Sequence, residues 1–379
     1  MALTLTNEQQ LLRDNAREFV RTHAPVSHLR RLRDGAAGSG FSRELWGQMA
    51  DFGWPGSVVP EAYGGMGLGH TELAIVMEEC GRTLAPAPFL SSVLLGAGVV
   101  LAAGSDAQKQ ALLPKLCSGE LLLALAFEEN SRFLPYHVAC KAERSGSSYR
   151  LQGQKRFVLD GHAAQHWIVS ARTSGAADDR AGISLFLVDP TRTGVRAERV
   201  PLLDGSIAVQ CVFEDLEVPS ADVIGSLDAG ADILGPVLDR ASICLGATLL
   251  GVITQAYETT LEYLKTRVQF DVPIGSFQAL QHRAVDMFCE LELCKSLVAE
   301  AVTATDAARA DVPALASAVK ARLTDASRWI TREAVQMHGG IGMTDEHDIG
   351  LYLKRAALAE LTLGDSAYHR DRFATLRGF

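Results

Sequence analysis

The chain has 379 residues, of which 47% are hydrophobic and 21% are charged, and its formal net charge is -9. This length is enough for two or three domains with a sizeable core, and the composition is typical of a globular protein. The acidic balance, without any basic run, argues against binding to nucleic acid or to an anionic membrane surface. The N-terminal segment lacks the basic and apolar regions of a signal peptide, so we expect a cytoplasmic protein.

The first third of the chain is predicted to be helical. A capping box at Thr6–Gln9 precedes apolar residues at near-helical spacing. A further helix is expected over residues 42–53, with Gly53 as its C-cap, and residues 70–84 are amphipathic. Residues 93–104 form an apolar stretch that is too short to span a bilayer and is expected to be a buried helix. No strand is evident before residue 118.

The middle of the chain is predicted to be a small β domain. Four β-rich runs, at residues 148–161, 166–173, 183–189 and 209–218, are separated by Gly, Asp and Pro. The first run is interpreted as two strands with a turn at Gly153. Because no helix separates the runs, a parallel sheet built from crossovers is disfavoured and an antiparallel barrel or sandwich is favoured.

A helical pattern returns at about residue 229 and persists to the end of the chain. We therefore predict three domains: a helical domain over residues 1–118, a β domain over 119–228 and a helical domain over 229–379. Few common enzyme folds place a small β domain between two helical ones.

Several common sites are not indicated by the sequence. The seven cysteines are odd in number and include no CxxC pair, which predicts reduced, mostly buried thiols. The ten histidines show no zinc spacing, so no metal is expected. The dinucleotide fingerprint, the phosphate-binding P-loop and the nucleophile elbow are also missing. A phosphate-bearing cofactor must then be held in another way.

Residues 267–282, "RVQFDVPIGSFQALQH", combine an arginine, two phenylalanines and three glutamines in one turn between helices. The planar guanidinium of arginine can donate two hydrogen bonds to a phosphate, phenylalanine offers a flat apolar surface, and the glutamine amide can hydrogen-bond to polar groups at the edge of a ring. Together they can hold a ligand that is both aromatic and phosphorylated. The alternative is an ordinary link between two helices.

This stretch is similar to the R-x-x-F-G…P-I…F-Q segment of flavin-dependent acyl-CoA dehydrogenases. "QMHGGIGMTDEHDIGLYLKR" (336–355) resembles that family's Q-x-x-G-G-x-G signature, and "PEAYGGMG", "KRFVLDG" and "WIVSART" match its pattern and order. The resemblance covers essentially the whole chain. It implies an α+β fold with a helical N-terminal domain, a central antiparallel β-barrel and a C-terminal four-helix bundle. It also implies FAD and at least a dimer.

The resemblance assigns the adenosine and pyrophosphate half of FAD to two segments that reach across a dimer interface. These segments supply Arg267, Gln269, Phe270, Gln278, Gln336, Gly339 and Gly340. Ser366 and Phe127 are the other implied cofactor residues outside the flavin-ring strand. For the glycine pair, the alternative is a plain helix C-cap turn.

The flavin-ring half departs from the family pattern. The family's T-E-P-x-x-G-S-D loop is replaced by "FEENSRFLPY" (127–136), with Glu129 where the proline would stand. The family's W-I-T is replaced by Phe157, Val158 and Leu159. Phe157 can still flank the ring, whereas Leu159 has no hydroxyl and can offer only its backbone N–H.

The catalytic base is also displaced. Most of the family carries a glutamate in an E-G-T-S turn, where this chain has "LGDSA" with Gly364 at the glutamate's place. A minority of the family carries the carboxylate on the first C-terminal helix just before an arginine, which matches Asp239 and Arg240. Asp239 lies beside an apolar stripe, and small residues at 242 and 246 share its face. The alternative is an Asp paired on a solvated helix side, and Asp365 is the reserve base.

The implied reaction is α,β-dehydrogenation of an acyl-CoA, with an electron-transfer flavoprotein as acceptor. The ending "LGDSAYHRDRFATL" and the loss of T-E-P resemble the branch described as pimeloyl-CoA dehydrogenase small subunits. The resemblance implies a role in lipid or steroid catabolism. Relatives in bacterial steroid catabolism assemble as two-subunit complexes, so a homodimer, a homotetramer or a heterotetramer is expected. One alternative is a silent subunit that lends its cofactor residues to a partner chain. A flavin-free hydratase or dehydratase on the same scaffold is another.

Overall fold

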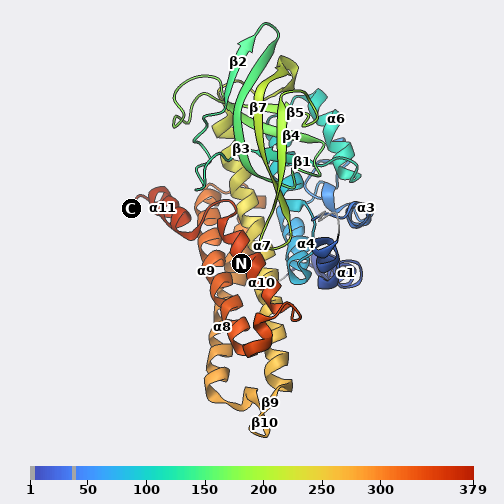
Figure 1. Cartoon of the computed structure of the whole chain (residues 1–379), viewed down its shortest axis with the longest axis vertical. Helices are drawn as coiled ribbons and strands as arrows, with labels where there is room; N and C mark the ends of the chain where they lie inside the picture. Colours follow the sequence, from blue (N-terminus) through green and yellow to red (C-terminus); the bar gives the residue numbers. More distant parts are fainter. Residues whose placement is uncertain (1–4, 36–39) are drawn as a thin grey trace. The chain divides into compact units, whose positions relative to one another are not determined.

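The computed structural model describes residues 5–35 and 40–379 of the chain (Figure 1). Its α-helices are α1 (Asn7–His23), α2 (Val26–Asp34), α3 (Arg43–Asp51), α4 (His70–Thr83), α5 (Gly98–Ala103), α6 (Asp106–Cys117), α7 (Gly230–Thr266), α8 (Gln278–Asp306), α9 (Val312–His338), α10 (Ile349–Leu361) and α11 (Ser366–Arg377). Its strands are β1 (Leu123–Ala126), β2 (Lys141–Ser145), β3 (Ser148–Leu159), β4 (His166–Arg172), β5 (Ile183–Val188), β6 (Val195–Pro201), β7 (Ile207–Pro219), β8 (Val223–Ile224), β9 (Val268–Gln269) and β10 (Val272–Pro273).

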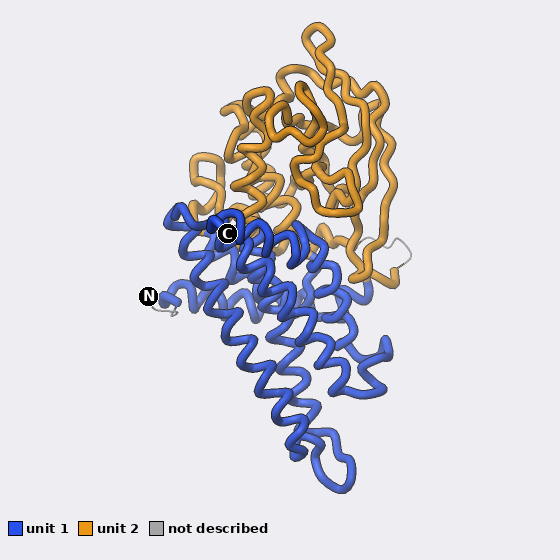
Figure 2. The backbone as a smooth tube through the Cα atoms, turned by 90° about the vertical axis from the view of Figure 1, so that its left-hand side faces the viewer, with its two compact units in different colours: residues 1–31, 70–86, 242–379 blue, residues 32–69, 87–241 orange. Residues whose placement is uncertain are grey.

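The chain divides into two compact units (Figure 2). Unit 1 contains residues 1–31, 70–86 and 242–379, and is helical apart from the short β9–β10 hairpin. Unit 2 contains residues 32–69 and 87–241 and includes the larger sheet. The long helix α7 begins in unit 2 and continues into unit 1. The predicted helical–β–helical order and the α+β fold class are thus confirmed.

The larger sheet of unit 2 has the strand order β6-β7-β3-β2-β4-β5-β8, with β1 paired to β4. Most pairs are antiparallel, but β1 and β2 both pair with β4 in parallel, so the sheet is mixed. The prediction of two strands over residues 148–161 is wrong, because β3 is one continuous strand. Gly153 has φ +151° and lies at a register shift of the β3–β7 ladder, so it marks a bulge and not a turn.

The buried side chains of unit 2 explain why this sheet forms. Trp167, Phe186 and Phe213 are almost fully buried on strands β4, β5 and β7. The predicted buried helix over residues 93–104 is present in two parts. A π-helical segment, Phe89–Ala97, leads into α5, and most of its residues are buried. Ser92 of this segment accepts a hydrogen bond from the Leu123 N–H at 3.0 Å, which joins the π-helix to β1.

In unit 1, glycines let α4 and α7 approach closely. A Cβ on Gly251 would lie 1.9 Å from the Glu78 carbonyl oxygen, and one on Gly81 would lie 2.2 Å from the Thr248 carbonyl oxygen. A larger residue at either position would force the two helices apart. By length and composition alone α7 can cross a membrane, yet 89% of its most apolar window is buried within the protein.

The predicted ends of the early helices are largely confirmed. Thr6 caps α1, with both hydrogen bonds of the capping box to Gln9 present. Gly53 follows α3 with φ +74°, the left-handed conformation expected beyond a helix C-terminus. All seven cysteines are free, and six of them are buried.

Candidate flavin and acyl-CoA site

Arg267 lies at the start of the β9–β10 hairpin, directly after α7. The Ile274 N–H donates to the Arg267 carbonyl at 2.8 Å and closes the hairpin. Phe270 and Asp271 at the hairpin tip both have left-handed φ angles, and Phe270 is 86% exposed. Its ring meets that of Phe277 edge-on, with ring centroids 6.2 Å apart. The stretch is therefore an ordered hairpin that presents an aromatic ring to solvent.

The second predicted segment lies beside the end of α7. The ring of Tyr263, four residues before Arg267, stacks on His338 with centroids 4.5 Å apart. His338 is the last residue of α9, and Gly339 follows it with φ +64°. A ring contact four residues from Arg267 thus connects the two implied cofactor segments. Gly339 does act as the C-cap of α9, so the two interpretations of the glycine pair are compatible.

The residues of these segments fit a phosphate-bearing aromatic group. Within the described part of the chain, no side-chain hydrogen bond or ion pair involves the exposed residues Arg267, Gln269, Gln278 or Gln336. A Cβ on Gly339 or Gly340 would meet no atom within 4 Å, so a ligand can approach this backbone closely. An uncommitted guanidinium, an exposed phenyl ring and open glycines on these two segments suit the adenosine diphosphate part of FAD.

The residues predicted for the flavin ring lie in unit 2. Phe157 has φ +53° and stands in a register shift between Lys155 and Val158 in the β3–β7 ladder. A bulge of this kind turns a side chain out of the regular alternation and is frequent next to active sites. Val158 is fully buried, whereas Phe157 and Leu159 are half-buried. Leu159 pairs with Ala208 of β7.

Phe127 follows β1 and is buried, with its ring edge-on to that of Phe133. The Arg156 N–H donates to the Glu128 carbonyl at 2.8 Å, which fixes the loop after β1 to the bulge of β3. The structure thus brings Phe127 and Phe157 to neighbouring segments of one sheet. No motif in the sequence signals this backbone bond, because it joins a loop to the irregular part of β3.

Asp239, the predicted base, is on the α7 part that belongs to unit 2. It is 5% exposed, so the alternative of a solvated helix side is wrong. Arg240 is half-buried, and within the described residues its side chain makes no hydrogen bond or ion pair. The small residues at 242 and 246 were expected to share the helix face of Asp239. At Gly246 this face is not open, because a Cβ there would lie 2.3 Å from the Val319 side chain. Gly246 therefore makes room for α9 and not for a ligand.

Tyr136 was not predicted as a site residue. Its hydroxyl oxygen would lie 3.3 Å from a Cβ on Gly235, one helical turn before Asp239. The Arg180 guanidinium lies over the Tyr136 ring at 3.8 Å from the centroid. A hydroxyl, a cation and a buried carboxylate thus occur around neighbouring turns of α7. Tyr136 ends the segment that replaces the family's T-E-P loop, but nothing in the sequence connects it with Arg180 or with α7.

The turn over residues 363–366 matches the turn that carries the catalytic glutamate in most of the family, but here it does not carry a base at that position. Leu363 has φ +59° and Gly364 has φ +97°, a conformation in which a glutamate at 364 would be strained. Asp365, the reserve base, is exposed and caps α11 by accepting from the Tyr368 N–H at 2.8 Å. Ser366, the implied cofactor residue, is buried in the first turn of α11. This arrangement favours Asp239 over Asp365.

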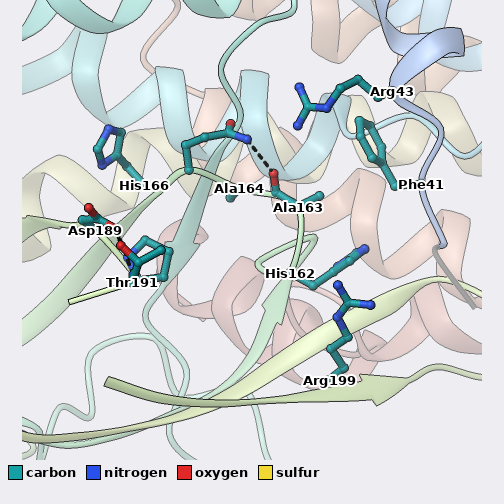
Figure 3. A pocket seen from close by; sticks show the side chains of 11 residues that line it. Phe41, Arg43, His162, Ala163, Ala164, His166, Asp189, Thr191 and Arg199 are labelled. Carbon is teal, nitrogen blue, oxygen red and sulfur yellow. Dashed lines mark hydrogen bonds between the residues drawn. The ribbon is translucent and has the colours of Figure 1, made fainter. Parts of the chain in front are cut away.

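A separate solvent-open pocket of about 660 Å³ lies wholly within unit 2 (Figure 3). Arg43, His162 and Arg199 line it, and Asp189 on its opposite side accepts hydrogen bonds from the Thr191 N–H and hydroxyl at 2.9 and 2.7 Å. None of the residues predicted for FAD or for catalysis lines this pocket. It is therefore not the predicted active site.

Comparisons with known proteins agree with this geometry. Residues 6–120 match the acyl-CoA dehydrogenase N-terminal domain, residues 128–215 the middle domain and residues 228–375 the C-terminal domain. Mitochondrial isovaleryl-CoA dehydrogenase of Pongo abelii is 31% identical over 97% of this chain and 88% of its own.

Two solved structures are similar over nearly all of the chain. The Tcur3481–Tcur3483 steroid ACAD is 30% identical, covers 99% of both chains and has a TM-score of 0.88. The ChsE4–ChsE5 complex from Mycobacterium tuberculosis is 28% identical, with 100% and 99% coverage and a TM-score of 0.89. Fold, domain matches and sequence identity agree, and the chain belongs to the acyl-CoA dehydrogenase family, whose members use FAD.

Proposed function

We propose that this chain catalyses α,β-dehydrogenation of an acyl-CoA thioester and that Asp239 is the base. The observation that carries the proposal is the burial of Asp239 on α7, beside the half-buried and uncommitted Arg240. A carboxylate in a dehydrated site is more basic than one in water, which suits removal of a proton from carbon. Arg240 is placed to hold the substrate by charge.

In this reaction the Cα–H and Cβ–H bonds break and a Cα=Cβ double bond forms. The Asp239 carboxylate takes the Cα proton, and FAD supplies the hydride-accepting chemistry at Cβ. The chain positions the thioester and keeps water from the carboxylate. Electrons leave through an electron-transfer flavoprotein, and the protein acts in the cytoplasm as a homodimer or homotetramer.

The acyl group is proposed to be branched or to belong to a larger lipid. Relatives named isovaleryl-CoA dehydrogenase support a short branched chain, whereas similarity to a steroid ACAD supports a bulkier substrate. The resemblance to pimeloyl-CoA dehydrogenase small subunits adds a dicarboxylic chain as a third candidate. An anaerobic titration of the holo-protein with one acyl-CoA of each class tests the proposal. Loss of the oxidised flavin absorbance with equimolar enoyl-CoA is expected for one class, and no loss with any of them contradicts it.

A second candidate function is a supporting subunit that lends Arg267 and Gln336 to the FAD of a partner chain. The observation in its favour is Leu159, which removes the hydroxyl expected beside the flavin ring. Similarity to the ChsE4–ChsE5 complex also supports it. Under this candidate the chain alone binds no flavin, and a co-expressed partner of the same family restores the bound flavin.

A further inference from the structure

The solvent-open pocket of unit 2 is built by segments that are distant in the sequence (Figure 3). They are Phe41 and Arg43 at the start of α3, residues 162–166 between β3 and β4, residues 189–191 after β5, and Arg199 of β6. The volume of about 660 Å³ lies within the range of roughly 300–1,000 Å³ that small-molecule sites occupy. None of the residues assigned to FAD or to catalysis lines this pocket, so the proposed reaction leaves it unexplained.

Arg199 reaches this pocket from the covered face of the sheet. Its register partner on β7 is Val209, whose own partner on β3 is Val158, and both valines are buried. Directly opposite residues on neighbouring strands point to the same face, so Arg199 stands where an apolar residue is expected. Within the part of the chain that the structure describes, no side-chain hydrogen bond or ion pair involves Arg199. Arg196, an odd number of positions earlier and hence on the other face, does pair with Glu214.

His162 is the second basic group on this wall. Figure 3 shows the ends of the His162 and Arg199 side chains turned toward each other, and both residues line the pocket. The Asp160 N–H donates to the Ile207 carbonyl at 3.2 Å, which fixes the segment after β3 beside β7 and so brings the two side chains to the same end of the sheet. Two cationic groups that face each other repel, and an anion between them removes this repulsion.

A second guanidinium and an aromatic ring form the neighbouring wall. The guanidinium carbon of Arg43 lies 5.8 Å from the centroid of the Phe41 ring, and Arg43 donates to the Glu120 carbonyl at 3.4 Å. A carbonyl does not neutralise a charge, so Arg43 also lacks a counter-charge among the described residues. Asp189, the acidic residue among those that line the pocket, accepts from the Thr191 N–H and hydroxyl and forms no ion pair with either arginine in the described part of the chain. Two arginines without a carboxylate partner are thus left in one pocket of a chain whose net charge is -9.

We propose that this pocket binds an aromatic phosphate of the size of a nucleoside monophosphate. The phosphate lies between Arg199 and His162, because a guanidinium and an imidazole N–H can donate to different oxygens of one phosphate. A phosphate suits donors from two sides better than a carboxylate does, since it carries more charge and three acceptor oxygens. The ring of the ligand packs against Phe41, beside Arg43. The inference does not depend on the proposed acyl-CoA reaction.

The test is isothermal titration calorimetry of the FAD-loaded protein with adenosine monophosphate, so that the FAD site is already filled. We expect one saturable site per chain, and we expect adenosine and inorganic phosphate to bind at least about tenfold more weakly, because each lacks one half of the contacts. Arg199→Ala should weaken the binding of adenosine monophosphate by about tenfold or more, since a charge-assisted hydrogen bond is lost. Arg43→Ala should weaken it severalfold, and an unchanged flavin spectrum shows that each variant is folded.

Arg196→Ala is the matched control, because it removes an exposed arginine from the other face of the same strand, and it should bind as wild type. Arg240→Ala, which removes the arginine proposed to hold acyl-CoA, should also keep this binding, and that result separates the pocket from the substrate site. The proposal is overturned if the wild type shows no saturable binding, or if Arg199→Ala and Arg43→Ala both leave the affinity unchanged. Equal losses in Arg196→Ala and Arg199→Ala overturn it as well, since they indicate nonspecific attraction. No measurement here uses acyl-CoA turnover, so a failure of this inference and a failure of the proposed function are distinguishable.

Discussion

The ammonium of Lys155 lies 2.6 Å from a carboxylate oxygen of Glu129, and both side chains are almost fully buried. Glu129 also accepts from the N–H groups of Ala139 and Cys140 at 2.7 and 3.1 Å, and Lys155 donates to the Ser170 hydroxyl at 2.9 Å. The pair joins the loop after β1 to β3 just before the bulge that carries Phe157. A buried pair of this kind therefore fixes two of the segments that are predicted to hold the flavin ring.

Removing one partner of this pair should be costly. We expect Lys155→Met to lower the free energy of unfolding by about 3–5 kcal/mol, because it leaves a buried carboxylate uncompensated. Adding Glu129→Gln should recover part of the loss, since the amide oxygen still accepts from the two N–H groups. Urea unfolding of the two single variants and the double variant measures the coupling.

The matched control is the ion pair between Arg196 and Glu214, whose side chains are exposed. Arg196→Met should change the free energy of unfolding by only about 0–1 kcal/mol. A Lys155→Met variant as stable as this control would show that the buried pair does not stabilise the loop.

Arg267→Ala should weaken FAD retention by about 1.5–3 kcal/mol, because a charge-assisted contact to phosphate is lost. Arg267→Lys should be intermediate, since it keeps the charge and loses the planar fork. The measurement is the flavin-to-protein ratio after gel filtration. Arg21→Ala, at an exposed position of α1, is the control and should retain flavin. Unchanged flavin in Arg267→Ala would make Arg267 an ordinary surface charge.

Asp239→Asn should abolish turnover while FAD and acyl-CoA binding persist, because the amide keeps the shape and cannot take the proton. Asp365→Asn should keep most activity and lose only part of the stability of the α11 cap, about 1 kcal/mol or less. Enoyl-CoA formation in single turnover measures both. The assignment is wrong if Asp365→Asn loses activity while Asp239→Asn retains the wild-type rate.

Lys320 gives a pH dependence of stability. Its fully buried ammonium donates to the carbonyls of Gly364 and Ala359 at 2.6 and 2.9 Å. Burial lowers the pKa of Lys320 to about 7, and the negative charges of Glu360 and Asp365 oppose this shift to a smaller extent. Below pH 7 both the folded and the unfolded chain carry the proton. Above it the unfolded chain binds more protons, so rising pH favours the folded state up to the ordinary lysine pKa near 10.5.

The unfolding free energy of wild type, minus that of Lys320→Met, should therefore increase between about pH 7 and 9, by at most about 1.4 kcal/mol per pH unit. The methionine of the variant does not titrate, so the pH dependence that the two proteins share cancels in this difference and the slope reports Lys320 alone. A difference that stays constant from pH 6 to 9 would show that Lys320 remains charged throughout.

The exposed hairpin tip predicts the assembly. We expect residues 267–282 and 336–343 to lie at a two-fold interface, so that Phe270→Asp should shift the mass in light scattering from dimer toward monomer and lower flavin content. Phe379→Asp is the control, because Phe379 is 94% exposed at the chain end. A wild-type monomer at micromolar concentration that retains FAD would contradict the interface.

The sequence predicted most of what depends on local pattern. The capping box at Thr6 and the turn that follows Arg267 are each encoded within a few residues, and the cap at Gly339 was the alternative interpretation of the glycine pair. What failed depends on contacts between distant segments. The single strand β3 with its bulges needs β7 as its partner, and Gly246 is small because Val319 packs against it. The burial of Glu128 beside the β3 bulge likewise follows from a backbone bond between residues 28 positions apart in sequence.

The most direct test of the account is the flavin content of this chain expressed and purified alone. Its own segments carry residues suited to both halves of FAD, so we predict a yellow protein with close to one FAD per chain. A colourless, folded protein that becomes yellow only after co-expression with a second family member would contradict the account and establish the chain as a supporting subunit.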